Sequence, residues 1–334
     1  MSVDYISYDD YTAENDTEDT ASGHGYDSSS QLYLTHVLVG LNILITAVGL
    51  AGNSLVIWIC GCKMKRTVVN TWYLSLAVSD LLFCAFLPLD VFYMITSHWP
   101  FGLLLCKLVS SLLSLNMYSS VFLLVLISTD RCIMTLFPIW CHNHRKVRRA
   151  YGAVLLMWLL SALLTLPSLI FKETAVRGSV TQCYSSYTDE SRHKAVVVTR
   201  LICGFVIPFL MIVTCCSVLC VKLGSMTVKS NKPYKIMGAL IFSFFCCWVP
   251  YHTFILLELD VKNHSVDLLQ TGLKVGATLA ASNSCISPFL YVFIGNDFKK
   301  TLKRSLISRM DVAMAEDLRT GGFSNSRSRT LEVL

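Results

Sequence analysis

Charge is scarce in this 334-residue sequence. Only 15% of the residues are charged and 54% are hydrophobic, whereas a soluble domain usually carries about a quarter charged residues. No segment alternates polar and apolar residues with a period of two, which argues against a membrane β-barrel. No internal repeat is visible, which argues against an inverted-repeat transporter. With a mean hydropathy of +0.55, the sequence predicts an all-α membrane protein.

Seven long apolar stretches predict a seven-transmembrane helix bundle, because a helix needs about 20 largely apolar residues to cross a bilayer. The spans are expected at Tyr33–Cys62, Val68–Thr96, Leu103–Leu136, Ala150–Phe171, Ala195–Leu223, Tyr234–Leu257 and Leu268–Ile294. Residues 1–32 are expected to form an acidic, disordered extracellular tail before the bundle of residues 33–294. Residues 295–308 predict an amphipathic helix in the membrane interface, followed by a cytoplasmic tail at residues 309–334.

Basic residues predict the orientation of the chain. No lysine or arginine precedes the first span, whereas the loops after the first, third and fifth spans and the C-terminal tail hold basic clusters. Such loops face the cytoplasm, so the N-terminus is expected outside a multi-pass plasma-membrane protein, without a cleavable signal peptide. Two glycosylation sequons, at Asn15 and Asn263, fall on the outer side. Cys106 and Cys183 fall there too, and an oxidising compartment predicts a disulfide between them.

Asp80 is the most deeply placed ionisable residue in the predicted spans. Ionisable groups within a membrane are costly and therefore mark candidate functional sites. If the helices pack in ring order, Asn116 and Ser120 converge on Asp80, and these oxygens would suit an allosteric sodium ion. The alternative is a neutral, hydrogen-bonded Asp80 that only fixes helix packing, and the sequence does not decide between the two.

Two arginines in the spans each have two interpretations. Asp130-Arg131 ends the third span, and is either a switch that holds and releases Arg131 or a pair of charges that satisfy one another at the interface. Arg200 lies in the fifth span with no acidic residue of that span within one turn. It either awaits an anion such as a peptide carboxylate or pairs with Asp90 or Glu258 of neighbouring helices.

Five spans contain a proline, which removes a helical hydrogen bond and favours kinks and hinges. These residues are Pro88, Pro167, Pro208, Pro250 and Pro288. The alternative is simple tolerance of proline in membrane helices.

Short motifs occur in a fixed order, one or two per span. They are Gly49-x-x-Gly52-Asn53, Leu76-Ala77-x-x-Asp80, Trp99-Pro100-Phe101-Gly102 before Cys106, Asp130-Arg131-Cys132, Trp158, Pro208, Cys247-Trp248-x-Pro250-Tyr251 and Pro288-x-x-Tyr291. Across nearly the whole chain they resemble the rhodopsin-like G-protein-coupled receptors. Asn143-His144-Arg145, Arg200 and Asn283-Ser284-Cys285 resemble the chemoattractant group of formyl-peptide, anaphylatoxin and chemerin receptors, and the chemerin receptors most.

This resemblance implies a receptor rather than an enzyme. It implies a peptide or small-protein ligand, with chemerin expected, and coupling to an inhibitory G protein and arrestin in chemotaxis and inflammatory signalling. The ligand would contact Arg200, Glu258, Leu113, Met117, Trp248 and Tyr251. Activation would involve Asp130, Arg131, Pro250, Pro288 and Tyr291, and kinases would act on Ser324, Ser326, Ser328 and Thr330. Membrane lipids are expected partners and nucleic acid is not; no cofactor or metal is expected beyond the possible sodium ion.

Two residues depart from the family pattern. Ser287 stands where relatives usually carry Asn or Asp, and Cys216 stands where they usually carry a tyrosine that stabilises the released Arg131 together with Tyr291. A thiol is a weaker hydrogen-bonding group, so the active state is expected to be less favoured. These two residues leave open a scavenging or arrestin-biased receptor of the same fold. The ligand-facing loops match the family least, so a receptor for another chemoattractant peptide or a lipid mediator is a further alternative.

Overall fold

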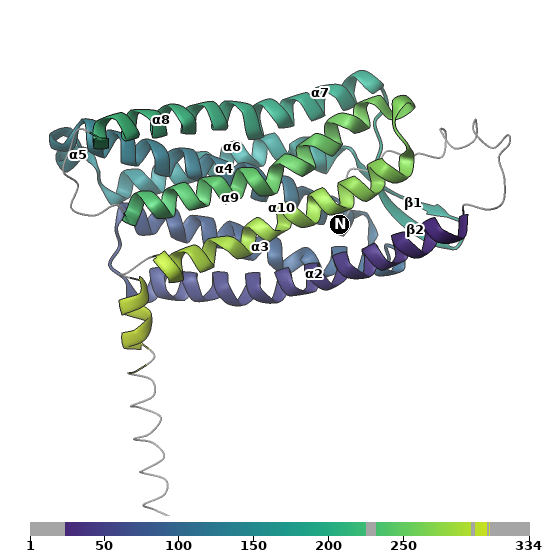
Figure 1. Ribbon diagram of the computed structural model, residues 1–334, viewed down its shortest axis with the longest axis horizontal. Helices are drawn as coiled ribbons and strands as arrows, with labels where there is room; N and C mark the ends of the chain where they lie inside the picture. The colour runs from purple at the N-terminus through teal and green to yellow at the C-terminus, as the bar shows by residue number, and fades with distance from the viewer. Residues whose placement is uncertain (1–23, 225–231, 295–297, 306, 308–334) are drawn as a thin grey trace, which may run out of the picture.

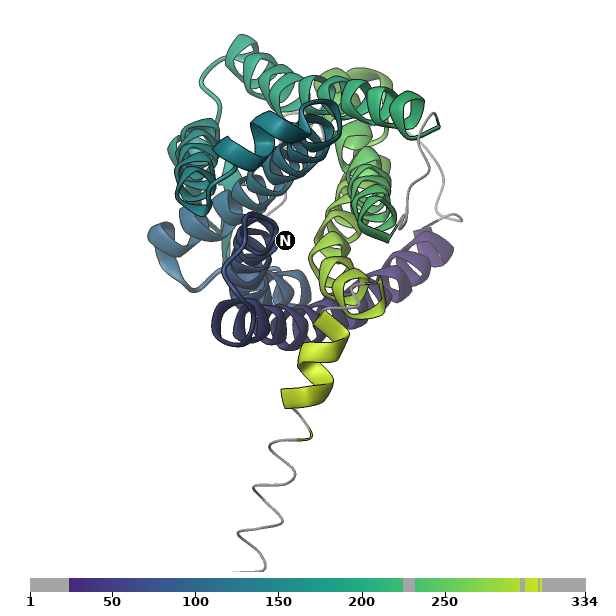
Figure 2. The same cartoon turned by 90° about the vertical axis from the view of Figure 1, so that its left-hand side faces the viewer.

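The computed structural model describes residues 24–224, 232–294, 298–305 and 307. Its long helices are α2 (His24–Trp58), α3 (Val68–Thr96), α4 (Gly102–Leu136), α6 (Val147–Ile170), α7 (Glu190–Leu201) with α8 (Ile207–Gly224), α9 (Lys232–Leu257) and α10 (Val266–Ile294). They lie side by side along the long axis of the molecule (Figure 1). Seen along that axis they form a closed ring, in which α10 packs against both α9 and α2 (Figure 2).

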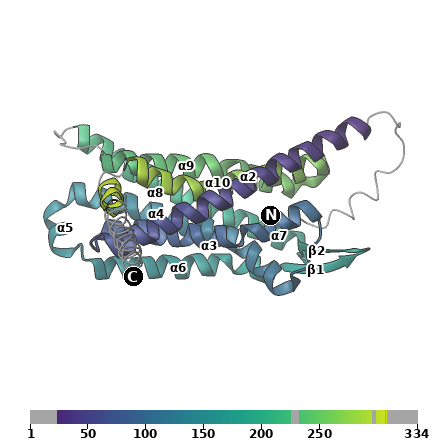
Figure 3. The same cartoon turned by 90° about the horizontal axis from the view of Figure 1, so that it is seen from below.

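Judged on the described residues alone, six of these helical segments are long and apolar enough to cross a membrane. The seventh, α10, has 29 residues, but its polar residues Asn283, Ser284 and Ser287 are buried against the other helices. Because α10 closes the ring, the predicted all-α seven-helix membrane bundle is confirmed. The first helix begins at His24, earlier than the expected span, which begins at Tyr33. The added residues are mostly polar and extend α2 beyond the bundle (Figure 3).

Shorter elements mark the two ends of the bundle. The hairpin of β1 (Lys172–Arg177) and β2 (Val180–Ser185) lies at one end, and α5 (Pro138–His144) lies at the other (Figure 3). We call these the hairpin end and the α5 end. Neither element was predicted from the sequence. A short helix at residues 298–305 points away from the ring at the α5 end, where an interfacial helix was expected (Figure 1).

The fifth long helix changes geometry just before Pro208. A π-helical turn, η2 (Ile202–Val206), joins α7 to α8. Each π turn holds one extra residue, so it rotates Arg200 by about 100° relative to the residues after it. Gly204 makes close packing possible there, because a Cβ atom on it would lie 2.7 Å from Cε of Met117 on α4. The other four span prolines lie inside continuous α-helices.

Candidate ligand and signalling sites

The hairpin covers one end of the ring and is fixed at several points. The predicted disulfide joins Cys106 at the start of α4 to Cys183 on β2. The Trp99 backbone N–H donates to the carbonyl oxygen of Thr181 at 2.8 Å, and the Thr181 N–H donates to Nδ1 of His98 at 2.9 Å. Strand β2 is thereby attached to both α4 and the loop before it.

Arg200 lies at the junction of four helices. Its side chain is buried, with a relative exposure of 4%. One terminal nitrogen donates to the Tyr251 hydroxyl on α9 at 3.1 Å, and the other donates to the Ser168 hydroxyl on α6 at 3.3 Å. Ser168 in turn lies 3.1 Å from the hydroxyl of Ser114 on α4. A buried guanidinium held by hydroxyls of two other helices is a group that can bind a carboxylate.

Aromatic rings lie directly beside this cluster. The Tyr251 ring is edge-on to Trp248, with 5.6 Å between centroids, and Trp248 also contacts Phe244 at 5.8 Å. Gly276 on α10 allows this arrangement, because a Cβ atom there would lie 2.8 Å from the Cα atom of Tyr251. The backbone position of Tyr251 is therefore set by close packing of α9 on α10.

The six residues proposed from the sequence to contact a ligand are all buried: Arg200, Glu258, Leu113, Met117, Trp248 and Tyr251. The apolar and aromatic members belong to one continuous core. Glu258 begins the 3-10 helix η3 (Glu258–Asn263), which directly follows α9. The structure thus places all six in the interior of the ring, with Arg200 and Tyr251 in direct contact.

Asp80 occupies the middle of α3 and is fully buried. The side-chain amide of Asn116 donates to its Oδ1 at 2.9 Å, and Ser284 of α10 donates to Oδ1 of Asn116 at 3.4 Å. Within the described ranges, Oδ2 of Asp80 and the hydroxyl of Ser120 make no hydrogen bond of ordinary geometry. These two buried oxygens fit a small cation that prefers oxygen ligands.

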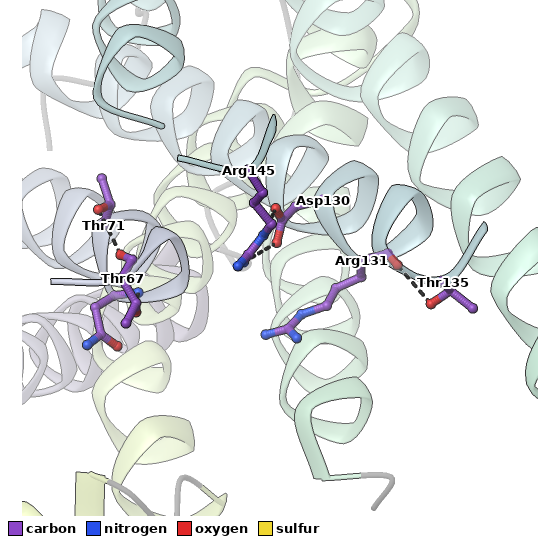
Figure 4. Close-up of polar contacts among 7 residues, drawn as sticks. Thr67, Thr71, Asp130, Arg131, Thr135 and Arg145 are labelled. Carbon is purple, nitrogen blue, oxygen red and sulfur yellow. Dashed lines mark hydrogen bonds and ion pairs between the residues drawn. The ribbon is translucent and has the colours of Figure 1, made fainter. Parts of the chain in front are cut away.

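At the α5 end, Asp130 pairs with Arg145 and not with its neighbour Arg131. Nε and one terminal nitrogen of Arg145 donate to the two Asp130 carboxylate oxygens at 2.7 and 2.9 Å. Figure 4 shows this two-point contact, with no interaction drawn between Asp130 and Arg131. Arg131 instead donates to the side chain of Tyr73 on α3. Hydrogen bonding to Asp130 raises the pKa of Arg145 above its usual range, so Arg145 stays protonated.

The remaining activation residues lie on α8, α9 and α10. Pro250 is on α9, and Pro288 and the buried Ser287 are on α10. Cys216 is half-buried on α8, beside Cys215, which approaches the Thr129 hydroxyl of α4 at 3.9 Å. Tyr291 belongs to α10, but its side chain lies outside the described part of the structure.

The predicted modification sites are only partly described. Asn263 is exposed on η3, and its side-chain amide donates to Asp260 at 2.8 Å. Asn15 and the tail sites Ser324, Ser326, Ser328 and Thr330 lie outside the described residues.

Three functional contacts had no signal strong enough to find them in the sequence. Arg145 is 15 residues from Asp130, and its motif served only as a marker of the receptor group. Ser168 and Tyr73 are ordinary residues of their spans. Their roles depend on which helices become neighbours, so no local pattern could identify them.

Known proteins are similar to this chain over most of its length. The sequence profile described as "7 transmembrane receptor (rhodopsin family)" matches residues 52–291. The chain belongs to this family. Chemerin-like receptor 1 of Mus musculus is 42% identical over 314 residues, covering 88% of this chain and 84% of that protein. The C3a anaphylatoxin chemotactic receptor of Oncorhynchus mykiss is 38% identical over 330 residues, covering 96% and 89%. Chemerin-like receptor 2 of Macaca fascicularis is 34% identical over 342 aligned positions, covering 98% and 94%.

The receptor is therefore a multi-pass membrane protein of the chemoattractant group of G-protein-coupled receptors, as the motifs predicted. The family and the relatives that it matches are receptors rather than enzymes.

Proposed function

We propose that this receptor binds the C-terminal carboxylate of a chemoattractant peptide or small protein of the chemerin type at Arg200. Signalling then passes through an inhibitory G protein and arrestin to chemotaxis and inflammatory responses. The observation that carries the proposal is the buried Arg200 guanidinium, which contacts two hydroxyls inside the ring. The similarity to chemerin-like and anaphylatoxin receptors supports the same class of ligand.

The hairpin end is proposed to face outward, with the N-terminus outside the cell. This end carries a disulfide, which persists in an oxidising compartment. It also carries the exposed sequon residue Asn263. Eight acidic residues precede Gln31 and would attract a basic ligand surface. Antibody staining of a tag at residue 1 on intact cells tests this orientation, and staining only after permeabilisation would overturn it.

Peptide binding tests the role of Arg200. A chemerin C-terminal peptide is expected to bind Arg200→Ala about 10- to 100-fold more weakly than wild type, because a hydrogen bond to a charged group contributes about 1.5–3 kcal/mol. Arg192→Ala is the matched control, since Arg192 is an exposed arginine of the same helix. A peptide with an amidated C-terminus should lose the same affinity on wild type and lose nothing further on Arg200→Ala. Equal binding of the acid peptide to both receptors would overturn the proposal.

A scavenging or arrestin-biased receptor is the second candidate, favoured by two specific residues. Cys216 and the buried Ser287 occupy positions where relatives are expected to carry stronger hydrogen-bonding groups. Ligand-driven nucleotide exchange on an inhibitory G protein supports the signalling receptor. Uptake of ligand without exchange supports the scavenger. Displacement of the peptide by a lipid carboxylate would favour a lipid mediator as the ligand.

We also propose an allosteric sodium ion between α3 and α4. Asp80 and Ser120 would hold it, with Asn116 positioning the carboxylate through Oδ1. The two buried oxygens without hydrogen bonds support this assignment.

A further inference from the structure

The α5 end contains two arginines near one carboxylate. Asp130 and Arg131 are adjacent on α4, so their side chains leave the helix about 100° apart. Arg145 approaches from outside the helix, where its flat guanidinium can face the carboxylate. It occupies both carboxylate oxygens at 2.7 and 2.9 Å, the geometry in which arginine–carboxylate pairs are strongest.

The pair is largely shielded from water. The exposed fraction of the side chain is 24% for Arg145 and 11% for Asp130, so screening weakens it less than it would an exposed pair. Arg145 also ends α5, because its backbone N–H donates to the carbonyl oxygen of Cys141 at 2.9 Å. One residue therefore joins α4 to the loop helix α5, whose Ile139 and Trp140 are exposed.

The position of Arg131 follows from this contact. With both Asp130 oxygens occupied by Arg145, the Arg131 side chain is directed away from Asp130 (Figure 4). It interacts instead with the side chain of Tyr73 on α3. If Arg145 is removed, the partly buried Asp130 carboxylate is left uncompensated, which is costly. The nearest remedy is Arg131 itself, which would turn back along α4 and leave Tyr73.

We propose that Arg145 is a positioning residue for signalling, because it occupies Asp130 and so leaves Arg131 available to a G protein at the α5 end. This inference rests on the proposed function. Competition between two arginines for one carboxylate would then set the fraction of receptors that can activate a G protein.

Nucleotide exchange per surface receptor tests the proposal in intact membranes. Arg145→Ala is expected to lower agonist-driven exchange about fivefold or more, the lower end of couplings between sites. Arg145→Lys should give an intermediate rate, because lysine keeps the charge but cannot bind both oxygens in the same way. Arg148→Ala is the matched control, an exposed arginine in the first turn of α6, and should match wild type.

A double-mutant cycle separates positioning from general damage to the loop. In an Asp130→Asn receptor, Arg145→Ala should cause no further loss, because the carboxylate that it would release is absent. Hydrogen exchange of residues 138–144 gives a second measurement that needs no G protein. It should accelerate in Arg145→Ala and not in Arg148→Ala.

The outcomes distinguish the two proposals. A wild-type receptor that stimulates no G protein overturns the proposed function. A signalling wild type whose Arg145→Ala variant exchanges nucleotide at the same rate overturns only the role of Arg145. The role of Arg145 is also overturned if Arg145→Ala lowers nucleotide exchange by the same factor in the wild-type receptor and in the Asp130→Asn receptor.

Discussion

Helices α6 and α10 differ sharply although both belong to the same ring. Helix α6 is long and apolar enough to cross a membrane, and most of its apolar stretch is not buried inside the bundle. Its leucines, such as Leu155, Leu159 and Leu163, are exposed on the outside of the bundle. By contrast, α10 buries the polar residues Asn283, Ser284 and Ser287 against its neighbours.

The difference between α6 and α10 follows from what each helix faces. An outward face must be apolar because lipid offers no hydrogen bonds, so α6 is recognisable from its residues alone. A helix that faces its neighbours can carry polar groups that hydrogen-bond across the ring, as Ser284 does with Asn116. Substitutions on the lipid-facing side of α6 and on the packed face of α10 should therefore differ in their consequences.

The strongest contrast is expected between two glycines. Gly276→Ala on α10 places a Cβ atom 2.8 Å from the Tyr251 backbone, and overpacking of this kind costs about 1–3 kcal/mol. Gly152→Ala on α6 meets no atom within 4 Å and should leave stability essentially unchanged. Thermal unfolding of the purified receptors measures both. Similar melting of the two variants would contradict the packing of α9 on α10.

A polar contact between α6 and α3 offers a second test. Trp158 donates from Nε1 to the Ser75 hydroxyl at 3.0 Å. Trp158→Phe should lower the free energy of unfolding by about 0.5–1.5 kcal/mol, the contribution of one hydrogen bond. Trp140→Phe, on the exposed loop helix α5, is the control. If Ser75→Ala and Trp158→Phe destabilise the receptor additively, the hydrogen bond does not contribute.

The response of stability to sodium tests whether the Asp80 site holds an ion. Replacing choline by sodium should stabilise wild type by about 1 kcal/mol when sodium is roughly five times its dissociation constant. Asp80→Asn should remove this response, because the carboxylate that would bind the ion is lost. The melting temperature in each salt, at constant ionic strength, measures the effect. Sodium stabilisation that survives in Asp80→Asn would exclude this site.

The smallest effect is expected from restoring the tyrosine of the family. Cys216→Tyr should raise G-protein activation about threefold, because one added neutral hydrogen bond contributes about 0.5–1.5 kcal/mol. The new hydroxyl would support the released Arg131. Cys220→Tyr introduces the same side chain at an exposed position of the same helix, and so controls for the size of the tyrosine side chain. Unchanged basal and agonist-driven exchange in Cys216→Tyr would remove the idea that the thiol weakens the active state.

Parts of the candidate sites were predictable from residue type alone. Asp80 and Arg200 stood out because an ionisable group in an apolar stretch is costly wherever the stretch lies. Asn116 was expected beside Asp80 and does donate to it, whereas the partners of Arg200 were not predicted as such. Ser168 and Tyr251 meet Arg200 only because α6, α7 and α9 come together at the hairpin end. The pairing of Asp130 with Arg145 was not predicted, because Arg131 is its neighbour in sequence and no pattern indicates the loop helix α5 that precedes Arg145.

The sequence by itself determined the seven spans and their approximate ends, because transfer of a segment into lipid depends mainly on its own residues. It also determined the Cys106–Cys183 disulfide, because both cysteines fall on the side that is expected to face an oxidising compartment. Only the tertiary structure decided which arginine binds Asp130, which hydroxyls contact Arg200 and which face of α10 turns inward. Those contacts depend on the distance and direction between helices far apart in the chain. A charged group in a medium of low polarity interacts with whatever lies within a few ångströms of it, and chain folding alone sets that neighbourhood.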